Sequence, residues 1–182
     1  MDEPKIKGAA IATYHAAIVA RKGKAEFDAY FAALTEPHRA MLSAGAIASA
    51  WYPETLLIDS IDTSVTRWGA EDTYRLAYEQ QKRLIRTAHS WLARLFGPKA
   101  IARASSSAWK MYRNTGRLRA ENRERELSLI IEEHIHCCRP HYPEMFAWAV
   151  SAVMDATGKA PQFRILRRPP QTAEIIFSWS HS

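Results

Sequence analysis

The sequence of 182 residues contains no long apolar run and only two cysteines, Cys137 and Cys138. A membrane-spanning helix needs about 20 consecutive apolar residues, so we expect no membrane span. The first residues lack the charged-then-apolar order of a secretion signal, and we therefore expect a cytoplasmic protein. Neighbouring residues of a strand point to opposite faces and cannot bridge without strain, so both cysteines are expected to be reduced thiols.

Clean positive patches are also lacking, although the formal net charge is +6. The densest basic stretch covers residues 113–125, where Glu121 and Glu124 dilute the positive charge. No aromatic side chain follows Tyr112 in this stretch, so stacking of nucleic-acid bases has no support there. Charge runs of mixed sign usually face water. We therefore expect a solvated loop at residues 113–125 and no nucleic-acid partner.

What the chain does contain is ample material for a core. Hydrophobic residues make up 47% of it, and six tryptophans are spread from Trp51 to Trp179. Bulky aromatic surface along the whole chain needs burial, and about 100–200 residues is the usual size of one domain. We therefore expect a single domain over residues 1–182, with a flexible N-terminus of about residues 1–5.

Apolar residues at helical spacing predict helices over the first two-thirds of the chain. Glycine and proline mark where these helices end and begin. The expected helices cover residues 8–20, residues 25–34, a short piece after Thr35, a piece after the Trp51-Tyr-Pro sequence, a helix of about six turns from residue 72 to residue 95, and residues 98–112.

The hydrophobic period changes near Glu126. Consecutive aliphatic residues favour a strand from Leu127 to Cys138, and a helix then ends near Gly158. Two short strands that begin near Phe163 and Glu174 close the chain. The predicted fold class is α+β, with a mostly helical N-terminal two-thirds packed on a small antiparallel sheet that the C-terminal third forms.

The segment from residue 125 to residue 141 concentrates three of the seven histidines and both cysteines. If this segment is a strand, alternation places His134, His136 and Cys138 on one face. Imidazole nitrogen and thiolate sulfur are ligands for zinc and similar metals. The candidate metal ligands are therefore His134, His136, Cys138 and, beyond a turn, His141.

Two other interpretations of the 132–141 strand stay open. An enzyme would use Glu132 or Glu133 as a base, and Cys138 would be a nucleophile beside His136. Alternatively, the histidines are hydrogen-bonded members of an ordinary sheet and Cys137 is a small buried residue. The chain lacks a nucleophile elbow, a glycine-rich phosphate loop and any hydrolase signature, which favours a function without catalysis.

The order of elements resembles a family of uncharacterised bacterial proteins. That family is similar in turn to the superfamily of the haem nitric-oxide-binding domain, the four-vinyl-reductase domain and the small subunits of the TRAPP trafficking complex. The resemblance covers roughly residues 6–180. Its landmarks are Trp51-Tyr-Pro before a helix, Phe96-Gly97 at the end of the long helix, Trp109-x-x-Tyr112, the histidine strand, and Phe177-Ser-Trp179 at the end.

This resemblance implies helices that cover a small antiparallel sheet, with a pocket for small ligands or surfaces for dimerisation. We expect a ligand-sensing, regulatory or scaffolding module that binds a small apolar ligand or a protein partner, and we expect it to form a homodimer. The candidate ligand-binding residues are Trp91, Trp109 and Tyr112. The Tyr-x-Ser-x-Arg signature that holds the haem propionates in the nitric-oxide sensors is missing, and Tyr112-Arg-Asn-Thr-Gly-Arg is its nearest equivalent. This absence argues against a haem of that type, and no other cofactor is indicated.

Overall fold

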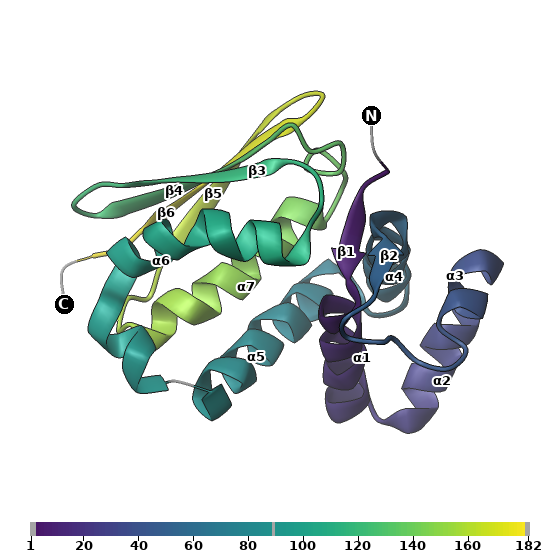
Figure 1. Cartoon of the computed structure of the whole chain (residues 1–182). Helices are drawn as coiled ribbons and strands as arrows, with labels where there is room; N and C mark the ends of the chain where they lie inside the picture. Colours follow the sequence, from purple (N-terminus) through teal and green to yellow (C-terminus); the bar gives the residue numbers. More distant parts are fainter. Residues whose placement is uncertain (1–2, 89, 181–182) are drawn as a thin grey trace.

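The computed structural model describes residues 3–88 and 90–180, apart from the side chains of Leu84 and residues 86–96. Figure 1 shows an N-terminal lobe of helices beside a C-terminal lobe that contains a sheet, with α5 between them. The N-terminal lobe comprises β1 (Lys5–Lys7), α1 (Gly8–Lys22), α2 (Lys24–Ala33), α3 (Glu36–Met41), β2 (Trp51–Pro53) and α4 (Glu54–Trp68). The rest comprises α5 (Ala70–Ala88), α6 (Ser90–Tyr112), β3 (Arg117–Asn122), β4 (Glu126–Glu132), α7 (Tyr142–Ala156), β5 (Gln162–Arg168) and β6 (Thr172–Ser178).

The core of the N-terminal lobe forms because apolar residues recur at helical spacing. Ile11, Tyr14 and Ile18 lie on one face of α1 and are buried. They pack in one cluster with Leu56 of α4 and with other buried side chains, which include Tyr30, Ile61 and Leu76. Strand β1 pairs with β2 antiparallel at the edge of this lobe. The N-terminus that was expected to be flexible therefore overlaps an ordered strand at Lys5.

The C-terminal lobe contains a four-stranded antiparallel sheet in the order β3-β4-β6-β5. Alternation points one set of side chains towards the helices, and this set is almost completely buried: Leu127, Leu129, Ile131, Ala173, Ile175 and Phe177. Helices α6 and α7 cover this face (Figure 1). The α+β fold class that the sequence predicts is confirmed.

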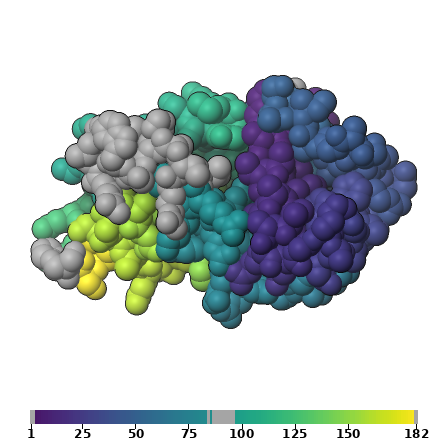
Figure 2. All heavy atoms as spheres, turned by 90° about the horizontal axis from the view of Figure 1, so that it is seen from below, coloured from purple at the N-terminus to yellow at the C-terminus, as the bar shows by residue number. Residues whose placement is uncertain are grey.

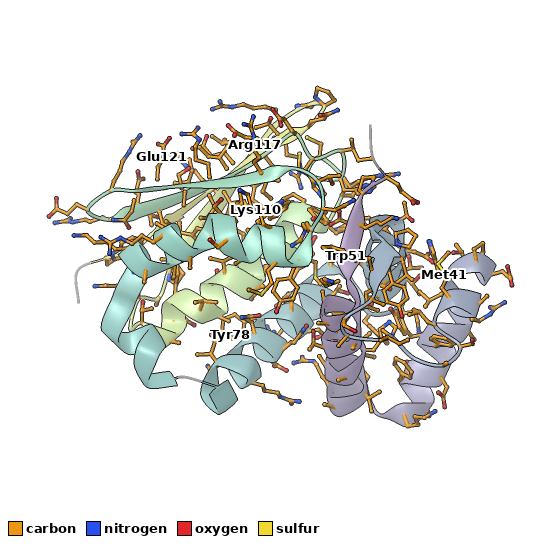
Figure 3. The ribbon with its side chains drawn as sticks, in the orientation of Figure 1. Met41, Trp51, Tyr78, Lys110, Arg117 and Glu121 are labelled. Carbon is orange, nitrogen blue, oxygen red and sulfur yellow. The ribbon has the colours of Figure 1, made fainter. Side chains whose placement is uncertain are left out.

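Strand β3 lies where the sequence predicted a solvated loop, and that prediction was wrong. Leu118 and Ala120 alternate with Arg117, Arg119 and Glu121. The charged residues of this set are on the sheet face that no helix of the described chain covers, as Figure 3 shows for Arg117 and Glu121. The charged residues therefore mark the solvated face of a strand. The strand forms here because pairing with β4 satisfies the hydrogen-bonding groups of the β3 backbone.

The long predicted helix corresponds to parts of two described elements, α5, which covers Ala70–Ala88, and α6, which covers Ser90–Tyr112. A break lies inside α6, where Gly97 has φ 56° and ψ −166°, far from helical values. Glycine reaches this region without a Cβ clash, and Pro98 then restarts the helix. The part of α6 after Gly97 therefore runs in its own direction and packs against β3 of the sheet.

Helix α5 joins the two lobes because it packs against α1 and α4 on one side and against α7 on the other. Figure 2 shows the lobes side by side, the N-terminal one in purple and blue and the C-terminal one in green and yellow. Among the helices of residues 3–88 and 90–180, none combines the length and apolar character needed to cross a bilayer.

Candidate functional site

The C-terminal lobe is hollow between α6 and α7. A cavity of about 460 Å³ lies there, and Gln81 of α5 and Leu118 and Leu129 of the sheet also line it. Small-molecule sites are typically apolar concavities of about 300–1,000 Å³ with a few polar groups. The cavity therefore has the size and the lining of a binding site for a small apolar ligand.

The hollow has a cause in the sequence. Ala100, Ala104 and Ala108 are spaced four residues apart, which places them on one side of α6. Ala149 of α7 lines the same cavity. Methyl groups on both helices leave space that larger side chains would fill.

A second cavity of about 360 Å³ adjoins the first towards the N-terminal lobe. Its lining is more polar and includes Thr13, Tyr14 and Gln80. The two cavities share five lining residues, which are Gln81, Tyr112, Arg113, Phe146 and Ala149. An elongated ligand could therefore keep an apolar part between α6 and α7 and reach polar groups between the lobes.

Two of the three expected ligand-binding residues line these cavities. Trp109 is buried, lines the first cavity, and donates a hydrogen bond from Nε1 to the Thr115 carbonyl at 3.0 Å. Tyr112 lines both cavities. The side chain of Trp91 lies outside the described residues. That Trp109 and Tyr112 bind a ligand stays a prediction.

Beside the shared wall lies a buried polar cluster of Glu54, Arg113, His134 and Tyr142, here called the buried quartet. Arg113 Nε donates to Glu54 Oε1 at 3.1 Å and to the Tyr142 hydroxyl at 2.9 Å. The Tyr142 hydroxyl donates to Glu54 Oε1 at 2.7 Å. His134 Nε2 lies 3.0 Å from that hydroxyl and 3.2 Å from Glu54 Oε2. The quartet joins α4, the end of α6, the segment after β4, and α7.

The quartet is charged although it is buried. Burial alone would raise the pKa of Glu54, but the contact with His134 and the positive charge of Arg113 outweigh it and lower that pKa to about 2. Burial raises the pKa of Tyr142 well above its usual value, so its hydroxyl keeps the proton that it donates to Glu54. The Arg113 guanidinium also stacks over the Trp109 ring, 4.3 Å from the centroid. Removing either Glu54 or Arg113 would leave the charge of the other unpaired in the interior.

Gly116 allows the chain to pass closely over the quartet. Its φ is 73°, and a Cβ built there would come within 2.8 Å of His134 Cβ. Both the backbone conformation and the space therefore require glycine.

The predicted histidine strand is only partly correct. Strand β4 ends at Glu132, Glu133 has a positive φ of 56°, and the following residues form turns. The expected row of metal ligands is therefore not formed. The side chains have separate partners: His134 in the quartet, His141 Nδ1 at 2.6 Å from the Tyr74 hydroxyl, and Cys138 Sγ at 3.5 Å from the Thr172 carbonyl.

One atom of that row has no hydrogen-bond partner. His136 is buried with its ring in edge contact with His134, and its Nε2 forms no hydrogen bond. Across the described residues, no three His, Cys, Asp or Glu side chains are grouped so that they could hold a metal ion. The turn that follows β4 thus keeps the two histidines near each other but gives the four side chains no common centre.

Sequence reasoning missed three members of the quartet, Glu54, Arg113 and Tyr142. Arg113 belongs to the stretch for which the sequence predicts a solvated loop, and no local pattern assigns a role to Glu54 or Tyr142. The residues are far apart in the chain, so no local pattern signals their contact. Arg113 did carry one signal, because it directly follows the Trp109-x-x-Tyr112 landmark at the end of α6.

Comparison with known proteins identifies the fold. No protein family model matches the sequence, and no curated protein matches it. Among solved structures, the Fe(II) unliganded H-NOX protein from K. algicida matches with a TM-score of 0.69 and 9% identity, over 97% of this chain and 98% of that one. A structure described as probing the function of heme distortion in the H-NOX family matches with a TM-score of 0.60 and 10% identity, over 97% and 96%.

These matches correct the expectation about haem. That expectation rested on a missing propionate-binding signature, but the fold of the H-NOX proteins is present without it, and those similar structures are described as an Fe(II) H-NOX protein and as a probe of heme distortion. Absence of the signature is therefore not a reason to dismiss haem. The resemblance to the haem nitric-oxide-binding superfamily is confirmed for the fold, because along almost its whole length this chain has the fold of the H-NOX proteins.

Proposed function

We propose that this chain is a sensory module that binds a small apolar ligand in the cavity between α6 and α7. The observation that carries the proposal is the hollow itself, about 460 Å³ lined by alanines and by aromatic and branched side chains. An interior is normally close-packed, so a hollow of this size with a shared polar wall is typical of a ligand site.

Haem is the first ligand to test, because a similar solved structure is described as probing heme distortion in the H-NOX family. The lining fits in one respect: Tyr112 carries a phenol, which is one of the side-chain types that ligate haem iron. When bound, haem would supply an iron atom that takes a gaseous ligand. The role of the described residues would be to exclude water and to orient the ring, with Trp109 and Phe146 as its apolar neighbours.

The buried quartet would couple the ligand to the rest of the molecule. Arg113 belongs both to the quartet and to the wall of both cavities, and Tyr142 lines the second cavity. A ligand that displaces Arg113 would change its contacts with Glu54 of α4. Ligand binding in the C-terminal lobe would in this way change a contact of the N-terminal lobe. Such coupling is the requirement for a sensor.

The test is a titration of the purified protein with haem, followed by its absorption band, beside a pair of matched variants. Ala108→Phe places a ring in the cavity, whereas Ser107→Phe places one on the neighbouring exposed position of α6, outside the described cavities. We expect Ala108→Phe to weaken binding about tenfold or more, which corresponds to about 1.4 kcal/mol. Ser107→Phe should bind as the unmodified chain does, and equal weakening by both variants would contradict the proposal.

A second measurement separates haem from other apolar ligands. Native mass spectrometry of the purified protein would show any molecule that it retains. If haem binds through the phenol oxygen, Tyr112→Phe should shift the absorption band while leaving the fold intact. If haem does not bind at all but a retained apolar molecule is lost in Ala108→Phe, the cavity is still the site and the ligand belongs to another chemical class.

A homodimer, a protein partner and a cytoplasmic location stay predictions. The edges of the large sheet are β3 and β5, and β5 carries Arg164, Arg167 and Arg168. Charged edges oppose strand pairing between copies, so we expect any dimer to use another surface. Sedimentation at micromolar concentration would show whether a dimer forms.

A further inference from the structure

The two adjacent cysteines lie together in the turn after β4, where a strand would have separated them. Backbone hydrogen bonds fix this turn: the Cys137 amide donates to the His134 carbonyl at 3.0 Å, and the Arg139 amide donates to the His136 carbonyl at 2.9 Å. The two sulfur atoms are 3.8 Å apart. The sequence-based expectation that neighbouring thiols point to opposite faces does not hold in a turn.

The two thiols differ in their access to solvent. Cys137 is completely buried in the core of the C-terminal lobe, and Cys138 is half-buried at the edge of that core. Burial, reinforced by the neighbouring Cys138, raises the pKa of Cys137 to about 12, so this group is a protonated thiol at neutral pH. A reagent from solution would meet Cys138 first and would then find a second sulfur within reach of the same atom.

We propose that Cys137 and Cys138 form a dithiol site for a trivalent arsenic centre. Soft sulfur ligands select soft, thiophilic partners. Structural zinc needs four ligands, and the described residues offer no third one beside this pair. A centre that is satisfied by two sulfurs and one organic or oxygen substituent fits the pair as it stands. This site is independent of the ligand in the cavity.

The reaction with phenylarsine oxide shows how the site would work. Each sulfur forms one bond to arsenic, the arsenic–oxygen bond breaks, and the oxygen leaves as water with the two thiol protons. Arsenic stays trivalent and no electron is transferred. Protonated thiols are thus suitable reactants, because they supply the protons that the departing oxygen needs.

The test is native mass spectrometry of the folded protein after incubation with phenylarsine oxide. We expect one adduct per chain, with the mass of the reagent less one water, that survives excess monothiol and is removed by a 1,2-dithiol. Cys138→Ser and Cys137→Ser each leave one thiol, so retention should fall about 100-fold through loss of the second, intramolecular bond. Arg139→Ala, an exposed change in the same turn, should retain the adduct as the unmodified chain does.

Adjacent cysteines could also react in an unfolded chain, so the thermal midpoint provides the second measurement. A reagent that binds the folded protein raises the midpoint, whereas one that binds only the unfolded chain lowers it. A rise that is absent in Cys138→Ser supports the site. A fall in the midpoint, or an adduct on either single-cysteine variant that resists monothiol equally well, overturns it.

Discussion

The two lobes use different sizes of side chain at their helix contacts, and the difference locates the site. In the N-terminal lobe, branched and aromatic residues such as Ile18, Tyr30 and Leu56 meet one another and are fully buried. In the C-terminal lobe, alanines of α6 and α7 face a hollow of about 460 Å³. Close-packed side chains thus stabilise the N-terminal lobe. The helices of the C-terminal lobe are packed less closely and leave space for a ligand.

The boundary between the lobes contains the feature with the largest expected effect on stability. Glu54→Gln removes the negative charge that faces Arg113 in the buried quartet. Breaking a buried ion pair by removing one partner costs about 3–5 kcal/mol, because the remaining charge is left without compensation. Urea unfolding monitored by circular dichroism measures this loss.

The control for that substitution is an exposed ion pair. Glu71→Gln breaks the contact with Arg75 on the surface of α5, and exposed pairs contribute about 0–1 kcal/mol. Equal effects of Glu54→Gln and Glu71→Gln would show that the buried quartet contributes no more to stability than an exposed ion pair does.

Truncation of one leucine in each lobe tests the difference in packing directly. Leu56→Ala opens a new cavity in the filled core and should cost towards the upper end of the usual range of about 2–5 kcal/mol. Leu129→Ala removes a side chain that already borders the hollow, so fewer contacts are lost and the cost should be near the lower end of that range. A larger loss for Leu129→Ala would mean that the hollow does not persist in solution.

Acid should lower the stability of the folded protein in two steps. One step comes from His15 inside the N-terminal lobe, and the other comes from Glu54 in the buried quartet. Burial lowers the pKa of His15, in the N-terminal lobe, to about 4. The folded protein therefore holds this imidazole neutral, and the stability it contributes is present above about pH 6.5 and is lost as the pH falls towards 4. The carboxylate of Glu54 has its pKa lowered to about 2, so its contribution is present above about pH 4.5 and is lost as the pH falls towards 2.

Each acid step should be on the order of 3 kcal/mol, and stability measured against pH would resolve them. His15→Phe removes the group that titrates and keeps an aromatic ring beside Phe27. We expect it to abolish the step above pH 4 and to leave the lower step. If the upper step persists in His15→Phe, another group is responsible for it.

The smallest expected effect on stability comes from two alanines of α7, one in a close-packed position and one beside the cavities. Ala147 of α7 is fully buried and borders none of the described cavities, whereas Ala149 lines both of the large ones. Ala147→Leu should destabilise the protein by about 1–3 kcal/mol through overpacking. Ala149→Leu should stabilise it by about 0.5–1 kcal/mol by filling space while weakening ligand binding. Thermal unfolding of the two variants should therefore shift in opposite directions.

The helices and the last two strands could be predicted because their information is local. The stripe of Ile11, Tyr14 and Ile18 predicts α1, and the alternation around Phe163 and Phe177 predicts β5 and β6. Strand β3 could not be predicted from charge, because its inward-facing residues are only Leu118 and Ala120, and they alternate with charged residues.

The candidate site was less predictable than the fold. Trp109 and Tyr112 stand out as aromatic landmarks, and both line the cavity. The partnership of Glu54 with Arg113 depends on two segments that are brought together only by the complete fold. A carboxylate at a helix start has the same local sequence whether it faces water or a buried guanidinium, so composition and spacing cannot distinguish the two environments.

The close passage of Gly116 over His134 has a consequence for mutational tolerance. In a saturation library scored for folded protein, position 116 should accept glycine alone, because a side chain there would meet both an unfavourable backbone angle and the ring-bearing carbon of a buried histidine. Gly158, just past the end of α7, also has a positive φ but has no atom within 4 Å of a built Cβ, so asparagine should survive there. The contrast between these two positions would report on the quartet without touching any of its four members.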